Sequence, residues 1–274
     1  MMEAASREAF SAATERLNTY AGRAKAESLR TVADELLAVA SLLGREPRLR
    51  RALSDPARSA EDRAGLATSL LGGQVSDGTQ TLVGVLVSGR WSTAHDLLDG
   101  TELLGVEALL AAAEKDGTLA EVEDELFRFG QIVAGQERLA AALGDVTAEP
   151  SQRRVLADSL LEGKVTAVTE RLVELALVGL GGRSFEASLT RLVELAAARR
   201  DREIGYVTVA SALSDGDEER LAAALQRIYR REISLKVSVD PRVLGGMSVQ
   251  VGSDLYDGTI LRRINETRAA LGRR

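Results

Sequence analysis

Three aspartates near the C-terminus have the spacing that comes closest to a ligand site. Asp240, Asp254 and Asp257 flank glycine-containing turns in the stretch DPRVLGGMSVQVGSDLYDG at 240–258. Carboxylates of this kind could hold a divalent cation, but a calcium-binding loop needs the denser D-x-D-x-D-G spacing, which this stretch lacks. Aspartate beside glycine is also typical of ordinary turns. The sequence therefore favours turn-forming aspartates, and we expect no metal.

Glycine-rich stretches could instead cradle a phosphate. Neither GLGGRS at 179–184 nor the Gly245-Gly246 pair has the G-x-x-x-x-G-K-[ST] pattern of a phosphate-binding loop. Gly163-Lys164 comes closer, but valine follows it where that pattern needs serine or threonine. We therefore expect no nucleotide and no other cofactor.

The single histidine is the remaining candidate for catalysis. Spacing alone leaves open a Ser-His-Asp hydrolase site through His95. A lone histidine near a loop is more often a surface residue or a helix cap, and we favour that interpretation. The sequence thus predicts no catalytic residue and a protein that is not itself an enzyme.

Composition excludes further classes of function. The chain has 274 residues, of which 45% are apolar and 3% aromatic, and its formal net charge is −6. This acidic balance argues against general nucleic-acid binding, which needs a concentrated positive surface. The absence of cysteine excludes disulfides and thiolate metal sites. The longest apolar run, at 81–89, is too short to cross a bilayer, and the first ten residues lack the apolar core of a signal peptide. We expect the chain to reach a membrane only through a partner.

The elements that would position any site are set by an internal repeat. When the sequence is shifted against itself by 90 residues, 35–87 and 125–177 align without a gap and share 18 identities in 53 positions. The identities include aspartate, arginine and glycine as well as leucine. Chance similarity between leucine-rich helices does not explain such a match, so we infer a duplication.

The repeated segment is helical. Val122, Leu126, Phe129 and Val133 recur at the spacing of one helix face. The pairs Thr118/Glu121 and Ser59/Asp62 resemble capping boxes, and Ser76 and Thr166, at equivalent positions, are expected to cap the helices that follow them. Short helices separated by glycine turns bury their faces against one another. We expect two tandem helical bundles, at 1–100 and 101–200.

The pattern changes in the tail, 201–274. YVTVAS at 206–211, ISLKVSV at 233–239 and MSVQVGS at 247–253 have the β-branched or alternating pattern of strands. Helices are predicted after Ser214 and over 259–272. The order β-α-β-β-α predicts a small α+β domain, and the whole chain is therefore mainly α.

The stretch 240–264 resembles the C-terminal signature of the delta subunit of bacterial ATP synthase, whose mitochondrial relative is the oligomycin-sensitivity-conferring protein. Tyr256 departs mildly from the aliphatic residue usual there. The family normally has one six-helix bundle, so the second bundle is similar to the long form found in actinobacteria. The signature positions, expected to be structural or docking residues, are Asp240, Pro241, Leu244, Gly245, Gly246, Val251, Gly252, Asp257 and Gly258.

The resemblance implies a non-catalytic stator subunit of the rotary, proton-translocating ATP synthase. It implies as partners the N-terminal segments of the alpha subunits, with beta subunits nearby, and b-type subunits of the peripheral stalk. The location implied is peripheral, on the cytoplasmic face of the plasma membrane. A stand-alone helical adaptor fits the repeat equally well but does not explain the signature.

The resemblance also suggests where these partners bind. The family uses the first and fifth helices of its bundle for the head, which in the second copy correspond to about 101–115 and 166–180. Our hypothesis is that one copy holds the alpha segments and the other braces the b-type helices. Arg262 and Arg263 give the acidic chain a basic end and are candidates for a stalk contact.

Overall fold

The computed structural model describes residues 3–201, 204–229, 233–240, 243, 245–251, 254–260 and 262. The chain divides into two compact units, Met1–Ala196 and Ala197–Arg274. No helix among the described residues is long and apolar enough to cross a membrane. The mainly α fold with a small α+β unit at the C-terminus confirms the predicted fold class.

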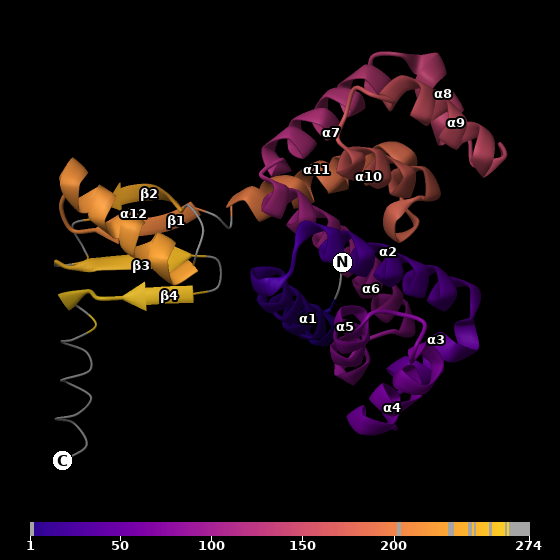
Figure 1. Ribbon diagram of the computed structural model, residues 1–274, viewed down its shortest axis with the longest axis horizontal. Coiled ribbons are helices and arrows are strands. Elements are labelled where there is room, and N and C mark those ends of the chain that lie inside the picture. Colours follow the sequence, from indigo (N-terminus) through magenta and orange to yellow (C-terminus); the bar gives the residue numbers. More distant parts are fainter. Residues whose placement is uncertain are drawn as a thin grey trace. The chain divides into compact units, whose positions relative to one another are not determined.

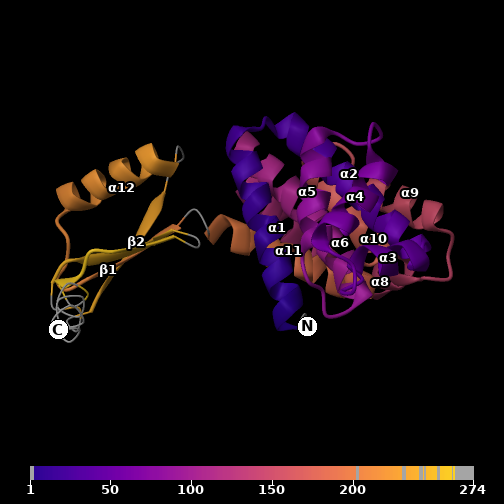
Figure 2. The ribbon, with the colours of Figure 1, turned by 90° about the horizontal axis from the view of Figure 1, so that it is seen from below.

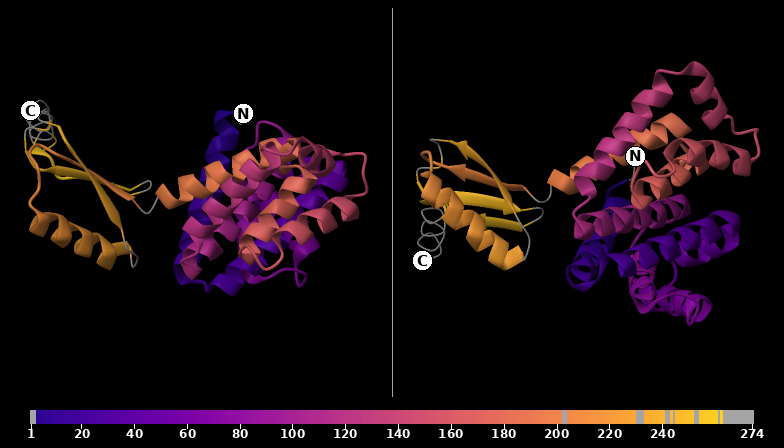
Figure 3. Two further views of the ribbon diagram at one scale, coloured as in Figure 1. Left: turned by 90° about the horizontal axis from the view of Figure 1, so that it is seen from above. Right: turned by 45° about the horizontal axis from the view of Figure 1, so that its top comes forward.

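The first unit is built of helices alone (Figure 1). The part that corresponds to the predicted first bundle contains α1 (Ala4–Arg23), α2 (Ala26–Arg45), α3 (Pro47–Ser54), α4 (Ala60–Leu71), α5 (Asp77–Ser88) and α6 (Ala94–Asp116). The part that follows contains α7 (Leu119–Ala134), α8 (Glu137–Gly144), α9 (Pro150–Leu161), α10 (Ala167–Val178), a short 3-10 turn (Leu180–Gly182) and α11 (Phe185–Asp201). The two sets form adjoining layers (Figure 3), and their buried side chains make one continuous core.

The central helix α6 belongs to both copies of the repeat. Adding 90 to the bounds of α1 gives 94–113, which matches the start of α6 at residue 94. Adding 90 to the start of α6 gives 184, one residue before α11 begins. The boundary predicted between residues 100 and 101 falls inside this shared helix. That the helical unit consists of two separable bundles stays a prediction. If it does, α6 would be common to both bundles.

Repeated polar contacts hold equivalent helices in place. Glu35 of α2 accepts hydrogen bonds from Ser76, and Glu125 of α7 accepts them from Thr166, with 3.0 Å between each carboxylate oxygen and the backbone nitrogen. The Ser76 and Thr166 hydroxyls cap α5 and α10, as predicted. Ser59 likewise caps α4.

One predicted cap does not form. The side chain of Thr118 makes no cap hydrogen bond at the start of α7. The reason is that Thr118 ends the preceding helix: its backbone N–H donates to Ala113 O at 2.8 Å and its hydroxyl donates to the same carbonyl at 3.4 Å. Gly117, in the left-handed conformation with φ 74°, makes this helix end possible. The capping-box prediction for Thr118 and Glu121 was therefore wrong.

The second unit is a four-stranded sheet covered by a helix on one face (Figure 2). Its strand order is β2-β1-β3-β4, with β1 parallel to β2 and antiparallel to β3. Val207, Val249 and Val251 are buried together with Leu225 of the covering helix. The elements are β1 (Ile204–Val209), α12 (Asp215–Tyr229), β2 (Ser234–Val239), β3 (Met247–Val251) and β4 (Asp254–Asp257).

The tail differs from its prediction at one element. β4 was not predicted, because four residues with two terminal aspartates have neither the length nor the alternation of a typical strand. It pairs antiparallel with β3, so that Val249 lies opposite Tyr256. Of the helix predicted over 259–272, only residues 259, 260 and 262 lie among those the structure describes.

Candidate functional site

His95 does not sit in a catalytic arrangement. Its side chain is 60% exposed, and its Nε2 lies 3.5 Å from Asp99 Oδ1 on the same helix. No group of three or more His, Asp or Glu among the described residues is placed to hold a metal ion. The histidine is therefore a surface residue of α6, which leaves the hydrolase alternative without a site.

The three C-terminal aspartates make separate contacts and do not converge on one site. Asp254 Oδ2 accepts a hydrogen bond from the Tyr229 hydroxyl at 2.8 Å. Asp257 Oδ1 accepts one from the backbone N–H of Thr259 at 3.0 Å, and hydrogen bonds from the hydroxyl and N–H of this threonine lower the pKa of Asp257. The backbone N–H of Asp240 donates to Val209 O at 2.8 Å. Asp254 thus joins β4 to α12, Asp257 orders the turn after β4, and Asp240 is held at the end of β2 through its backbone.

The signature glycines allow a close crossing of two backbone segments. Gly245 and Gly246 have φ values of 110° and 80°, which side chains rarely tolerate. A Cβ on Gly246 would also lie 2.5 Å from Gly258 O. Backbone bonds close the crossing: Gly258 N donates to Met247 O at 2.9 Å, and Ile260 N donates to Gly245 O at 3.0 Å. The signature therefore encodes a compact turn, with no ligand needed to explain it.

Not all signature positions can be placed. The structure brings Gly245, Gly246, Asp257 and Gly258 together at this crossing, and Val251 is buried in β3. Arg262 is exposed, and its backbone N–H donates to the Thr259 hydroxyl. Pro241, Leu244, Gly252 and Arg263 lie outside the described residues.

In the second copy, one of the two helices expected to form the head-binding groove is α6, and part of α6 is buried on every face. Ten consecutive residues of α6, 104–113, are buried. Ten residues make almost three helical turns, so every face of this part of the helix is packed. Part of the cover comes from α2 of the first copy, which packs along α6, and Asp34 on α2 pairs with Arg171 on α10 at 2.9 Å. A partner helix therefore has no access to α6 between α2 and α10.

The equivalent helices of the first copy, α1 and α5, are more open. They pack closely at two points, where a Cβ on Gly78 would lie 2.9 Å from the Tyr20 ring and a Cβ on Gly89 would lie 2.7 Å from Ala9 Cβ. Between these points Thr81 on α5 is exposed, and its repeat equivalent is the half-buried Arg171. The half-buried residues on these two helices include Phe10, Thr14, Gly84 and Val85. The accessible residues of α1 and α5 thus include both apolar and polar side chains, which suits an amphipathic helix.

A half-buried carboxylate joins α6 to the turn that follows α10. Glu102 Oε2 accepts a hydrogen bond from Gly181 N at 2.7 Å. Burial and the neighbouring charge of Asp99 raise the pKa of Glu102 and outweigh the hydrogen bond from Gly181 and the charge of Arg183, which lower it. Nothing in the local sequence signalled this contact, because its two ends are 79 residues apart.

Glutamine at position 102 is expected to stabilise the protein at alkaline pH. Because the folded-state pKa of Glu102 is raised, its contribution to stability is present below the unfolded pKa and is lost as pH rises through the folded pKa. Glu102→Gln keeps an oxygen for Gly181 and carries no charge. We expect its Tm to exceed that of the parent at about pH 8 and the gain to vanish near pH 4. Thermal unfolding across this range checks the prediction, with the exposed Glu121→Gln as the control; equal gains at both pH values would contradict it.

Comparison with known proteins identifies the family. The model of the ATP synthase delta (OSCP) subunit matches residues 19–99 and 106–271. The chain is 60% identical to ATP synthase subunit delta of Salinispora arenicola over the full length of both chains. It is 47% identical to ATP synthase subunit delta of Streptomyces griseus, covering 99% of this chain and all of that protein. The chain therefore belongs to the ATP synthase delta (OSCP) subunit family, whose members are structural and not catalytic subunits of that enzyme.

Proposed function

We propose that the chain is the stator cap of a proton-driven rotary ATP synthase, located peripherally on the cytoplasmic face of the plasma membrane. In this role it links the catalytic head, through the N-terminal segments of the alpha subunits, to the b-type peripheral stalk. Family membership supports the proposal, and so does a chain built largely of packed helices.

The surface between α1 and α5 is the proposed site for the alpha segments. The observation that carries this choice is the burial of all ten residues from 104 to 113, which closes the corresponding surface in the second copy. Exposed Thr81 and half-buried Phe10 and Val85 suit an amphipathic segment that lies along the first copy.

The b-type helices are then proposed to contact the second copy and the C-terminal unit. Phe127 and Ile132 on α7 are 54% and 50% exposed, and Ile260 beside Arg262 is 46% exposed. Exposed apolar side chains of this size mark candidate interfaces. The signature turn would act by holding the backbone around Ile260 and Arg262 in place.

Site-specific crosslinking tests the assignment of the alpha segments. The chain has no cysteine, so a single introduced cysteine is a unique attachment point for a photoreactive maleimide. In the assembled, detergent-solubilised complex we expect Thr81→Cys to crosslink to the alpha subunit. Val178→Cys, on the equivalent helix of the second copy and 81% exposed, should not. Crosslinking is preferable to deleting residues 1–100, because that deletion would cut α6 in two.

Three other outcomes are informative. Crosslinks to alpha from position 178 but not from 81 would place the head on the second copy and overturn the choice of surface. No crosslink from either position to any ATP synthase subunit, in a complex that contains the variant chain, would contradict a head-binding role for the helical unit. Failure of the chain to copurify with the complex would favour a stand-alone adaptor.

A further inference from the structure

The two copies of the repeat differ in how one face of their second helix is covered. On α2 this face consists of Ala33, Leu37, Ala40 and Gly44, which recur at the spacing of one side of a helix. The first three are 0%, 7% and 5% exposed. The shared helix α6 lies against this face, where a Cβ on Gly105 would be 2.8 Å from Leu37 Cγ and 3.4 Å from Ala33 O. The contact is therefore a close helix crossing, in which a leucine packs over a glycine.

The equivalent face of α7 is not covered in this way. Its residues, 90 positions later, are Glu123, Phe127, Gly130 and Ala134. The Phe127 side chain is 54% exposed, Ala134 is exposed, and a Cβ on Gly130 would meet no atom within 4 Å. Small residues that permit a close crossing are thus present on α7, beside a large apolar side chain that lies in solvent.

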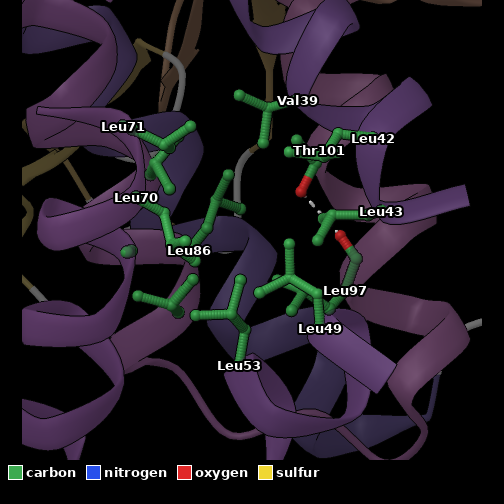
Figure 4. Close-up of a pocket in the computed structure, with 13 residues that line it drawn as sticks. Val39, Leu42, Leu43, Leu49, Leu53, Leu70, Leu71, Leu86, Leu97 and Thr101 are labelled. Carbon is green, nitrogen blue, oxygen red and sulfur yellow. Dashed lines mark hydrogen bonds between the residues drawn. The ribbon is translucent and has the colours of Figure 1, made fainter. Parts of the chain in front are cut away.

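The inner side of each helix, by contrast, is packed in both copies. In the first copy, Val39 and Leu43 of α2 point toward the same apolar interior as Leu97 of α6 (Figure 4). Their equivalents on α7, Phe129 and Val133, are 4% and 0% exposed. The exposed face of α7 is therefore not the sign of a loosely packed helix.

A charged contact at the edge of this face differs between the copies in the same way. Asp34 of α2 pairs with Arg171 of α10, from the first copy to the second, at 2.9 Å. The equivalent Asp124 of α7 pairs with Arg128 of its own helix at 3.3 Å, and their side chains are 63% and 74% exposed. Such an exposed pair contributes little stability, so Asp124 can take a basic side chain of a partner instead.

We propose that this face of α7 receives a helix of the peripheral stalk in the way that α2 receives α6. The partner helix presents glycine or alanine where it crosses Phe127, and an arginine or lysine that reaches Asp124. Gly105 and Arg171 supply these two features inside the chain itself. The choice of b-type subunits as the partner rests on the proposed function, whereas the packing mode rests on the repeat. A second copy of this chain is a poorer occupant, because residues 104–113 of α6 are already buried.

Titration calorimetry of the full chain with b-type subunits purified in detergent tests the packing. Gly130→Leu should weaken binding at least about tenfold, because the added side chain holds the two helices apart. Gln131→Leu is the matched control, since its equivalent, Ser41, stays exposed on the covered helix. Phe127→Ala should weaken binding by a similar factor, and Phe127→Leu, which restores the side chain of the first copy, should retain most of it.

A charge reversal tests the basic side chain of the partner. Asp124→Arg should weaken binding about fivefold or more, because it repels the arginine or lysine expected there. Asp158→Arg is the matched control: this exposed aspartate also faces an arginine of its own helix, with Arg154 Nε at 4.0 Å, but it lies on α9. Equal losses in the two variants would mean that the stalk subunits respond to the charge of the whole chain, and would overturn this part of the proposal.

The remaining outcomes separate this proposal from the proposed function. Parental affinity in both Gly130→Leu and Phe127→Ala would overturn the docking face and leave the stalk-linking role intact. Equal losses in Gly130→Leu and Gln131→Leu would also overturn it, since any added apolar side chain would then interfere. No binding of b-type subunits to the parent chain would overturn the stalk-linking role together with the docking face. Circular dichroism checks that Gly130→Leu is folded, and the variants at the exposed Phe127 decide the test if it is not.

Discussion

Replacing Glu35 with alanine is expected to lower the free energy of unfolding of the helical unit by about 3 kcal/mol. Both carboxylate oxygens accept from the Ser76 backbone nitrogen at 3.0 Å. One of them also accepts from the Ser76 hydroxyl at 2.6 Å and from the Thr79 hydroxyl at 2.5 Å. Alanine would leave these donors in a partly buried site, where unmet hydrogen bonds to a charged group are costly. Chemical denaturation followed by circular dichroism measures the loss.

The effect of Glu35 should depend on pH in a defined direction. Burial raises the pKa of Glu35, but hydrogen bonds from the Ser76 and Thr79 side chains and the Ser76 backbone together lower it further. A carboxylate with a depressed folded-state pKa contributes stability above its unfolded pKa and loses it as pH falls through the folded pKa. The difference between the parent and Glu35→Ala should therefore be full at neutral pH and shrink in acid.

An exposed glutamate provides the control. Glu15 on α1 is exposed, and Glu15→Ala should change the unfolding free energy by less than about 0.5 kcal/mol. Glu125→Ala, which removes the equivalent carboxylate from α7, should cost about as much as Glu35→Ala, because Thr166 and Thr169 donate to it in the same pattern. A loss at position 35 no larger than that at position 15 would show that the carboxylate is dispensable.

The role of these two glutamates could not be predicted from local sequence patterns. Ser76 and Thr166 could be predicted as caps because a cap depends on residues within one turn. The carboxylates that support them are 41 residues away, and no local pattern connects the two. Glu35 and Glu125 are identical in the aligned repeat, which was the one signal that could have drawn attention to them.

The shared helix was missed for a related reason. The repeat is clear from residue 35 onward, where side chains are matched by identity. It fades in α1, which has a solvent-exposed face that α6 lacks over 104–113. A boundary near residue 100 follows from the repeat length but cannot reveal that one helix serves both copies. The C-terminal signature was recognisable in sequence. The reason for its glycines required the structure: the two backbone segments cross so closely that a Cβ at position 246 would lie 2.5 Å from Gly258 O.

Gly100→Ala is expected to destabilise the helical unit by about 2 kcal/mol, although alanine is the better helix former. A Cβ at position 100 of α6 would lie 2.4 Å from the Trp91 ring. That ring is 7% exposed and is held by a hydrogen bond of 2.7 Å from its Nε1 to Leu86 O, so it cannot easily move away. The overlap should outweigh the gain in helix propensity of up to about 1 kcal/mol.

A second glycine in a helix should respond in the opposite direction. A Cβ on Gly130 of α7 would meet no atom within 4 Å, so Gly130→Ala should raise the unfolding free energy by up to about 1 kcal/mol. Trp91 is the only tryptophan, and its fluorescence therefore follows the first copy while circular dichroism follows all the helices. If α6 couples the two copies, both signals should shift together in Gly100→Ala. Loss of the fluorescence transition ahead of the helical signal would show that the copies unfold separately and that α6 does not join them into one cooperative body.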